Sequence, residues 1–305
     1  MNDKRFPESR QDLIAIQSSL VEHLEKAREA TVCIKLKQGS GSGVIVSADG
    51  LVLTAAHVAG GVNRRLTVVL EDGTEYEAKS LGVNADNDAA MLQIEGQEDL
   101  PYVEIEKKRD SLKPETELGD WVFSLGHSGG YDKERGSVVR LGRMVRVAKS
   151  TVQSDCKLIG GDSGGPLFDM NGTLIGIHSR VGRVLEQNMH VPIQVFHKYW
   201  GALSAGEFIG SGPFAEKPVP GTGFLGLAVE EVEGGLEVSR VEPKQPAQVA
   251  GIEVGDLLLE LDGVELQSSS DLKELMAKRS AGDLVEVSYS RDGEVVVEEI
   301  TLAKR

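Results

Sequence analysis

Short apolar segments, each about the length of one β-strand, follow one another from residue 31 and are separated by turn signals such as Asp49-Gly50 and Asn171-Gly172. With 36 glycines and only 5% aromatic residues, the composition favours many tight turns between short strands. The predicted strands are 31–36, 43–46, 51–54, 66–70, 75–83 and 89–94, followed by 121–125, 136–145, 151–153, 166–169, 173–178 and 189–191. Two groups of about six short strands are typical of two packed β-barrels, so the sequence predicts a mainly β fold.

The first 30 residues have a different pattern, with apolar side chains at helical spacing. Ser9 and Asp12 form a plausible capping box at the start of this helix. Its apolar positions are Leu13, Ile16, Leu20, Leu24 and Ala27. One face of the helix therefore needs a partner, either the barrels or another subunit.

The region after the barrels changes character at residue 201, beyond a short closing helix predicted at 192–200. Gly, Ser, Ala and Pro dominate residues 201–222, as is typical of a linker between domains. The predicted organisation is therefore a helical segment (1–30), a double-barrel domain (31–200), this linker and a C-terminal domain (223–305).

The charge and the cysteines exclude several classes of function. A net charge of −15 and a pI of about 4.9 make nucleic acid an unfavourable partner. No apolar run is long enough to predict a membrane span. Cys33 and Cys156 are too few for a disulfide framework and lack metal-ligand spacing, so we expect two buried free thiols and no metal or cofactor.

The segment from Gly160 to Pro166 (Gly-Gly-Asp-Ser-Gly-Gly-Pro) is the most specific motif in the chain. A serine nucleophile in acyl transfer needs a sharp turn, N–H groups directed at the developing oxyanion, and an open approach. Glycines around Ser163 meet these needs because they permit positive φ and close backbone approach. The N–H groups of Gly161 and Ser163 are the predicted oxyanion-hole donors, although a glycine-rich turn with a serine can also be purely structural.

Two further motifs supply the other members of a catalytic triad. The run Leu-Thr-Ala-Ala-His-Val ends an apolar strand at His57, whose small neighbours leave room for the imidazole to face a cleft. The run Asn-Asp-Ala-Ala-Met-Leu then places Asp88 at the start of an apolar strand, where it can be buried against His57. The ordered set His57, Asp88 and Ser163, each at a strand edge, predicts nucleophilic catalysis.

These three motifs resemble, in order and approximate spacing, the trypsin-like serine proteases and among them the high-temperature-requirement A (HtrA, or Deg) family. The resemblance implies endoproteolysis of polypeptides through an acyl-enzyme, with His57 as general base, Asp88 orienting it and Ser163 attacking. It also implies that Ser179 supports the buried aspartate, and that the protein is a homotrimer in the periplasm or outside the cell. Met1 to Arg10 lacks the apolar core of a signal peptide, so a cytoplasmic location stays open.

The residue before the nucleophile departs from this family. HtrA proteins usually carry Asn there, whereas this chain has Asp162. In secreted relatives of trypsin that aspartate pairs with a freshly cut N-terminal amine, but no activation cleavage site is visible here. Asp162 is therefore expected to have another partner or a solvated position.

The C-terminal domain resembles a PDZ domain of the HtrA kind. It opens with the apolar, glycine-containing loop Phe224, Leu225, Gly226 and Leu227, whose N–H groups can bind the terminal carboxylate of a peptide. The strand at 227–229 would add the peptide as a further strand. A helix predicted at 271–279 would form the other wall of the groove, with Leu272 and Met276 facing the bound peptide.

Two residues suggest an unusual specificity pocket. In the trypsin-like fold, Lys157 would lie near the pocket floor, and His178, next to Ser179, on its wall. Histidine at that position resembles glutamate-cleaving endopeptidases of this fold, so cleavage after acidic residues is one interpretation. The alternative is an exposed Lys157 and a hydrogen-bonded His178 in the core, because lysine rarely stays buried unpaired.

The competing function is a binding protein, a PDZ-bearing scaffold or chaperone with a vestigial protease barrel. Degenerate members of the fold normally lose a triad residue, and this chain retains His57, Asp88 and Ser163 together with the oxyanion glycines. The sequence therefore favours an active endopeptidase.

Overall fold

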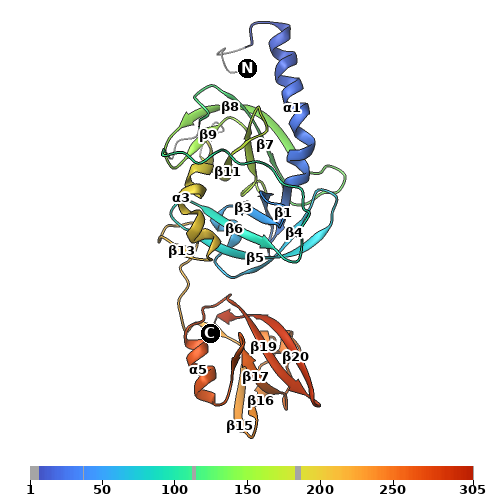
Figure 1. The fold of residues 1–305 in the computed structure, drawn as a ribbon, viewed down its shortest axis with the longest axis vertical. Coiled ribbons are helices and arrows are strands. Elements are labelled where there is room, and N and C mark those ends of the chain that lie inside the picture. The colour runs from blue at the N-terminus through green and yellow to red at the C-terminus, as the bar shows by residue number, and fades with distance from the viewer. Residues whose placement is uncertain (1–6, 37, 112–114, 183–186, 305) are drawn as a thin grey trace. The chain divides into compact units, whose positions relative to one another are not determined.

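The computed structural model describes residues 7–36, 38–111, 115–182 and 187–304. The chain divides into two compact units, one of residues up to 62 together with 66–216, the other of residues 63–65 together with 217–305. Each unit has its own hydrophobic core. Figure 1 shows the elements of both units in chain order.

The first six strands form a barrel that closes because β5 also pairs with β6. They are β1 (Thr31–Lys35), β2 (Ser40–Ile45), β3 (Leu51–Thr54), β4 (Arg65–Val69), β5 (Glu75–Asn84) and β6 (Ala89–Ile94). Branched and long apolar side chains such as Val52, Leu53 and Met91 are fully buried inside it. Burial of this kind is what makes such residues favourable on a pleated sheet.

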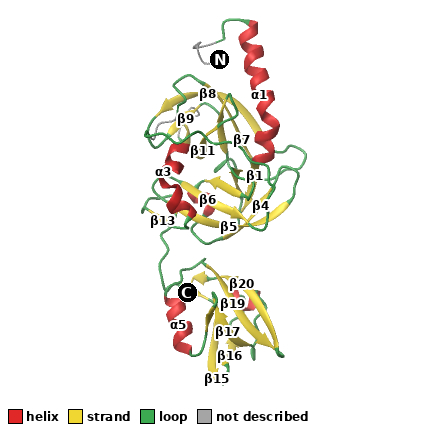
Figure 2. Cartoon of the chain, viewed as in Figure 1, coloured by secondary structure: helices red, strands yellow, loops and turns green. Residues whose placement is uncertain are grey.

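The next six strands form a second closed barrel, in the order β10-β11-β12-β9-β8-β7. They are β7 (Trp121–Gly126), β8 (Val138–Val147), β9 (Val152–Ser154), β10 (Pro166–Asp169), β11 (Leu174–Val181) and β12 (Asn188–Pro192). The rings of Phe123 and Phe168 stack in its core with their centroids 5.0 Å apart. The predicted mainly β double barrel is thus confirmed, with strand ends shifted by a few residues (Figure 2).

Helix α1 (Arg10–Ala30) precedes the barrels. Its predicted capping box is present, because Ser9 Oγ accepts from the Asp12 N–H and the Asp12 carboxylate accepts from the Ser9 N–H. Ile16 and Ala27 are buried, whereas Leu13 is 58% exposed. The apolar stripe therefore packs on the unit along only part of its length.

The segment predicted as a linker belongs in its first part to the first unit. Helix α3 (Ile193–Ser204) runs beyond the predicted closing helix, and β13 (Phe208–Ile209) pairs with β5 in parallel. The boundary of the unit therefore lies near Glu216 and not at residue 200. Composition misled here because a Gly- and Ser-rich segment can still supply a few apolar side chains to a core, as Phe208, Ile209 and Phe214 do.

The C-terminal unit is a small sheet with two helices, as predicted for a PDZ domain. Its main sheet has the order β15-β16-β17-β19-β20, with β18 on β17, and β14 pairs with β21. The elements are β14 (Gly223–Phe224), β15 (Leu227–Val232), β16 (Gly235–Val241), α4 (Pro246–Val249), β17 (Leu257–Leu261), β18 (Val264–Glu265), α5 (Ser269–Ala277), β19 (Leu284–Arg291), β20 (Glu294–Thr301) and β21 (Ala303–Lys304). Strand β15 lies at the edge of this sheet, and one side of its backbone pairs with no other strand of the described residues.

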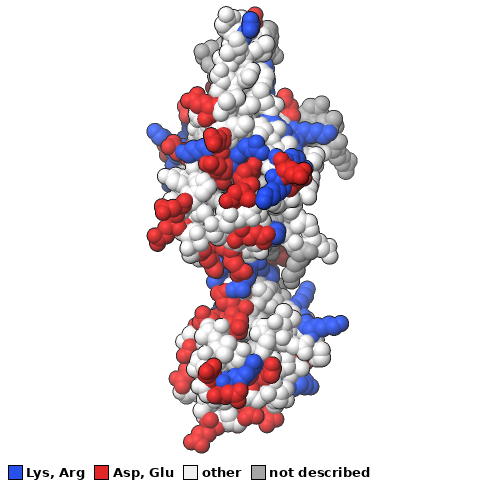
Figure 3. All heavy atoms as spheres, turned by 90° about the vertical axis from the view of Figure 1, so that its right-hand side faces the viewer, with Lys and Arg blue, Asp and Glu red and all other residues white. Residues whose placement is uncertain are grey.

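On the face drawn in Figure 3, acidic side chains are spread over both units, and basic side chains are interspersed among the acidic ones. This distribution matches the net charge of −15. Cys33 and Cys156 are both free and buried. Among the described residues, no helix has the length and hydrophobicity of a membrane span.

Candidate active site

His57 lies on the short helix α2 (Ala56–Ala59), directly after β3. The helix ends at Gly60, which adopts a left-handed φ of 71°. Ala55 and Ala56 are fully buried, whereas the His57 side chain is 36% exposed. The small buried neighbours anchor the helix, and the imidazole faces outward.

Asp88 lies in the tight turn between β5 and β6 and adopts a φ of 59°, which is uncommon for a residue with a side chain. Asn84 Oδ1 holds this turn by accepting from the N–H groups of Asp86 at 3.1 Å and Asn87 at 3.0 Å. The fully buried Asp88 carboxylate accepts from His57 Nδ1 at 2.9 Å and from the His57 backbone N–H at 3.2 Å. The unusual backbone thus directs the carboxylate at the imidazole.

A second-barrel residue completes the surroundings of Asp88. Ser179 on β11 donates its hydroxyl to Asp88 Oδ2 at 2.5 Å. Within the described part of the chain, no lysine or arginine forms an ion pair with Asp88. The carboxylate is therefore not neutralised by a permanent cation, and its negative charge can stabilise a protonated His57.

Ser163 lies in the turn before β10 and shares a pocket of about 390 Å³ with His57 and Ser179. Its Oγ is 3.5 Å from the Ser179 carbonyl oxygen, a long hydrogen bond. No hydrogen bond joins Ser163 Oγ to His57 among the residues that the structure describes. Catalytic hydrogen bonds are often loose before substrate binds, so this geometry is compatible with a resting nucleophile.

The backbone around Gly161 has the geometry that an oxyanion hole requires. The Gly160 carbonyl accepts from the Gly129 N–H at 2.7 Å. Because the intervening peptide is trans, the Gly161 N–H points away from Gly129. Neither this N–H nor that of Ser163 has an acceptor within the described residues. Both donors are therefore available to a developing negative charge.

Only glycine fits at position 161. Its φ is 96°, and an added Cβ would lie 2.4 Å from the His127 carbonyl oxygen. The Gly161 carbonyl is held in turn by the hydroxyl of Ser42 at 2.8 Å. Ser42 belongs to β2 of the first barrel, and its N–H also donates to the Ser163 carbonyl at 2.7 Å. Sequence reasoning did not identify Ser42, which no motif marks.

Two residues predicted in the specificity pocket lie elsewhere, which corrects the sequence-based hypothesis. Lys157 is exposed and does not line the pocket at Ser163. His178 is fully buried, with Nε2 3.1 Å from the Leu125 carbonyl oxygen and Nδ1 2.9 Å from His190 Nδ1. Successive side chains of a strand point to opposite faces, so Ser179 faces Asp88 while His178 points into the barrel.

The pocket is lined instead by apolar side chains. Leu158, Ile159 and Val181 line it together with Phe214 and Arg180. The Arg180 guanidinium lies 5.0 Å from the centre of the Phe214 ring. Phe214 was missed because it falls in the segment assigned to the linker, and no motif pointed to Arg180.

A second serine–histidine contact lies inside the second barrel. Ser154 Oγ is 2.8 Å from His190 Nε2, and His190 contacts His178. Burial lowers the pKa of His190 to about 3, and burial followed by the neighbouring His190 lowers the pKa of His178 well below its usual range. All three side chains are fully buried, so this chain of contacts is structural and inaccessible to substrate.

The PDZ loop is shaped to offer N–H groups. The carbonyls of Leu225 and Gly226 accept from the N–H groups of Ala247 at 2.8 Å and Glu242 at 2.7 Å, whereas their own N–H groups have no acceptor in the described residues. Gly226 has a φ of 81°, and an added Cβ would lie 2.2 Å from Gln245 Cβ. The loop leads directly into the unpaired edge of β15.

The side chains predicted for the groove of this unit lie around that edge. Leu225 and Leu272 are in the core, and Leu227 and Met276 are partly buried against it. Leu272 and Met276 lie on α5, which spans Ser269–Ala277 and begins two residues before the predicted helix. Phe224, in β14, is partly exposed.

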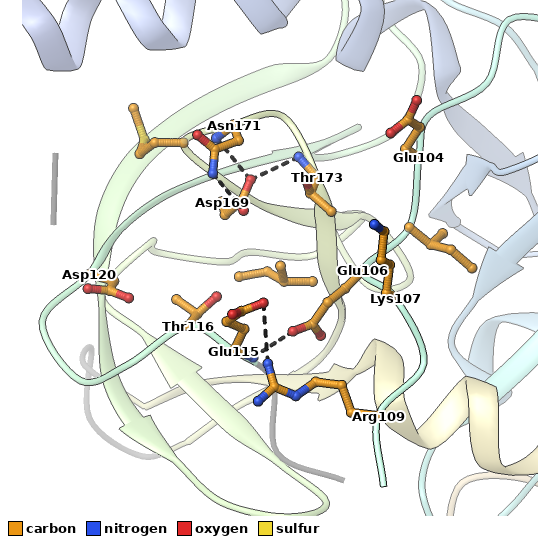
Figure 4. A pocket seen from close by; sticks show the side chains of 13 residues that line it. Glu104, Glu106, Lys107, Arg109, Glu115, Thr116, Asp120, Asp169, Asn171 and Thr173 are labelled. Atoms are coloured by element: carbon orange, nitrogen blue, oxygen red, sulfur yellow. Dashed lines mark hydrogen bonds and ion pairs between the residues drawn. The ribbon is translucent and has the colours of Figure 1, made fainter. Parts of the chain in front are cut away.

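A cavity of about 520 Å³ lies away from the triad, between the segment around Glu106 and the β10–β11 turn (Figure 4). The buried Glu106 carboxylate accepts from the Glu115 N–H at 2.5 Å and from Gln194 Nε2 at 3.0 Å. Arg109 pairs with the Glu115 carboxylate at 3.2 Å. These polar groups satisfy one another, so the cavity offers no argument for a second active site.

Comparison with known proteins agrees with this geometry. The trypsin-like peptidase domain family matches residues 41–177, and the PDZ domain family matches residues 223–302. A "Probable periplasmic serine endoprotease DegP-like" from Pseudomonas fluorescens is 32% identical over 285 residues, covering 87% of this chain and 56% of that protein. A protein of the same name from Halomonas elongata is 31% identical over 268 residues, covering 85% and 55%. The chain belongs to the HtrA-like serine proteases.

Solved structures share the fold of this HtrA-like chain. The serine endoprotease from Yersinia pestis has a TM-score of 0.52 at 24% identity, covering 98% of this chain and 99% of that one. The HtrA-type protease AlgW with tripeptide has a TM-score of 0.52 at 22% identity, covering 95% and 97%. The chain spans about half the length of the curated DegP-like relatives it matches.

Proposed function

We propose that this HtrA-like chain is a serine endopeptidase that cleaves unfolded or partly unfolded polypeptides. The observation that carries the proposal is the set of contacts around Asp88, which joins His57 and Ser179 beside Ser163 in one pocket. His57 and Ser163 line this pocket, where a substrate carbonyl can approach, and Asp88 is buried behind His57. The proposed chemistry uses side chains and backbone groups of the chain together with water.

The proposed mechanism follows from these positions. Ser163 Oγ attacks the scissile carbonyl carbon while its proton passes to His57 Nε2. The N–H groups of Gly161 and Ser163 stabilise the negative charge that forms on the carbonyl oxygen. His57 then donates the proton to the departing amine, and water, deprotonated by His57, hydrolyses the acyl-enzyme. Asp88 stabilises the imidazolium and fixes its orientation throughout.

The pocket favours an apolar residue before the scissile bond. Leu158, Ile159 and Val181 offer apolar surface, and burial of a medium-sized aliphatic side chain contributes about 1.5–3 kcal/mol. With Lys157 exposed and both nitrogens of His178 engaged, neither residue supports the acidic preference. Sequencing the products of a digested proteome should find cuts after Val, Ala or Ile more often than after Glu or Asp.

Peptide C-termini are the proposed ligands of the PDZ domain. The free N–H groups of Leu225 and Gly226 support this, together with the open edge of β15. A decapeptide ending in valine should bind about 10–100-fold more tightly than its C-terminal amide, because amidation removes a charge-assisted hydrogen bond. Equal affinities in isothermal titration would show that the loop does not bind carboxylate.

The family resemblance also supports a homotrimer and a periplasmic location. The curated relatives are named as periplasmic enzymes. Exposed Leu13, Ile14 and Val21 on α1 provide apolar surface that a second subunit could cover. Light scattering of the purified chain measures the oligomeric state, and a monomer at micromolar concentration would contradict the trimer.

Loss of the nucleophile tests the proposed activity directly. Ser163→Ala should abolish casein hydrolysis and labelling by a fluorophosphonate, with circular dichroism unchanged. Ser150→Ala, a matched change at an exposed serine, should leave both intact. A wild-type protein that is neither labelled nor active, yet binds peptides, would favour the alternative of a PDZ-bearing scaffold.

A further inference from the structure

The residue before the nucleophile is fully buried and paired with an arginine. The Asp162 carboxylate accepts from Arg140 Nη2 at 2.8 Å and Nη1 at 3.4 Å, and the Arg140 side chain is only 15% exposed. Arg140 lies on β8 of the second barrel, 22 residues before Asp162. The pair therefore links the nucleophile turn to the wall of that barrel.

Two neutral donors complete the surroundings of this carboxylate. Ser128 Oγ donates to Asp162 Oδ1 at 2.7 Å, and Arg140 Nη2 also lies 2.7 Å from Ser128 Oγ. The Ile159 N–H donates to Asp162 Oδ2 at 2.8 Å. Gly126 leaves room for the group, since an added Cβ there would lie 2.6 Å from Asp162 Oδ1. Both carboxylate oxygens are thus fixed.

These contacts fix the backbone that carries the oxyanion donors. Asp162 lies between Gly161 and Ser163. Its carboxylate accepts a hydrogen bond from the Ile159 N–H, and its own N–H donates to the Ile159 carbonyl at 3.1 Å. The loop 159–162 is therefore closed on itself by both the backbone and the side chain of Asp162. Moving the carboxylate would rotate the peptides on both sides, including the one that presents the Gly161 N–H.

Charge decides whether the carboxylate stays in place. A buried anion without a cation is unfavourable, and it moves toward water when the fold permits. Ile159 and Gly160 are exposed, so this loop can open toward solvent. The cation of Arg140 stabilises the Asp162 carboxylate in its buried position, so the loop stays closed.

We propose that Arg140 is a positioning residue that, through its ion pair with Asp162, holds the loop 159–162 with the Gly161 N–H directed at the substrate carbonyl. The inference rests on the proposed peptidase function and adds how its oxyanion hole is kept formed. Arg140 does not line the pocket at Ser163, and its effect passes through Asp162, directly and by way of the Ser128 hydroxyl. The oxyanion hole is thereby kept formed by Arg140, a cation that belongs to strand β8 of the second barrel.

Replacement of the arginine by an uncharged side chain of similar length provides the test. In the full chain, Arg140→Met should lower kcat on a chromogenic peptide by roughly 100-fold or more, the cost of losing one oxyanion donor. KM should change by less than about threefold, because the apolar pocket stays. The rate of fluorophosphonate labelling should fall with kcat. Arg146→Met, on the same strand but exposed, is the matched control and should keep wild-type kinetics.

A double variant separates positioning from a general loss of stability. Asp162→Asn combined with Arg140→Met removes both charges, which is often nearly neutral when both partners of a buried pair are replaced. This double variant should recover kcat to within about tenfold of wild type. The conservative Arg140→Lys should fall between Arg140→Met and wild type, because lysine keeps the charge without the two-pronged contact.

The outcomes distinguish the two proposals. An inactive wild type means that the peptidase function itself fails. An active wild type with a folded, fully active Arg140→Met overturns the positioning role. If Arg140→Met does not fold, the double variant decides: a folded double variant with activity near wild type supports the role, and one that is folded but as inactive as the Ser163→Ala protein overturns it.

Discussion

Two turns of the catalytic unit each bury an aspartate, and the two are neutralised in different ways. Asp88, before β6, accepts from His57 and Ser179 and, within the described residues, forms no ion pair with a lysine or arginine. Asp162, before β10, accepts from the guanidinium of Arg140 as well as from Ser128. Both carboxylates are fully buried. An aspartate that must stabilise a positive charge during the reaction is left without a resident cation, whereas one that holds a loop in place has its cation permanently.

The largest predicted effect is on the Asp88 side of this comparison. Asp88→Asn should lower kcat by about 10⁴-fold, because the amide stabilises neither the imidazolium nor the correct tautomer of His57. Asp162→Asn should cost no more than the roughly 100-fold that loss of an oxyanion donor causes. Steady-state kinetics on one peptide measure both. Equal losses in the two variants would mean that the two aspartates do not have separate roles.

A smaller effect is predicted for the neutral donor to Asp88. Ser179→Ala removes one hydrogen bond to a charged group, which contributes about 1.5–3 kcal/mol, so kcat should fall about 10–100-fold with KM little changed. Ser179→Thr keeps the hydroxyl and should recover most of the activity. A Ser179→Ala enzyme with wild-type kcat would show that His57 alone suffices to hold Asp88.

The smallest effect concerns stability, at the buried histidine pair formed by β11 and β12. His178 and His190 have lowered pKa values, and burial lowers that of His190 to about 3. Below the ordinary histidine pKa, the unfolded chain therefore binds more protons at these two residues than the folded chain does. Their contribution is complete above the ordinary histidine pKa of about 6.5. The free energy of unfolding should therefore fall as the pH drops from about 6.5 toward 3. Urea titrations should show a shallower fall for His190→Gln, and identical slopes would contradict the lowered pKa.

The proposed triad is visible in the sequence because each member lies in a local motif. Small residues before His57, the strand start at Asp88 and the glycines around Ser163 are all visible in a few consecutive letters. The double barrel followed from the same kind of signal, since strand length and turn residues are local. The position of Asp162 next to Ser163 also indicated that this carboxylate would have either another partner or a solvated position.

Features that depend on the direction of a side chain could not be predicted in this way. Arg140, Arg143 and Arg146 all lie on β8, and only the pleat and register of the barrel decide that Arg140 reaches Asp162. The same alternation turns His178 into the core beside Ser179. Counting residues back from Ser163 failed for Lys157, because a residue count does not give the direction of the side chain, which is exposed.

The proposed active site is divided between the barrels, with His57 and Asp88 on the first and Ser163 and Ser179 on the second. Ser42 of the first barrel bonds the backbone of the nucleophile turn at 2.7 Å, and Ser179 reaches across to Asp88. Turnover therefore reports whether the two barrels are docked, independently of whether each one is folded. Gentle heating or low urea should inactivate the enzyme before far-ultraviolet dichroism changes, and an inhibitor bonded to Ser163 should raise the midpoint of that earlier transition.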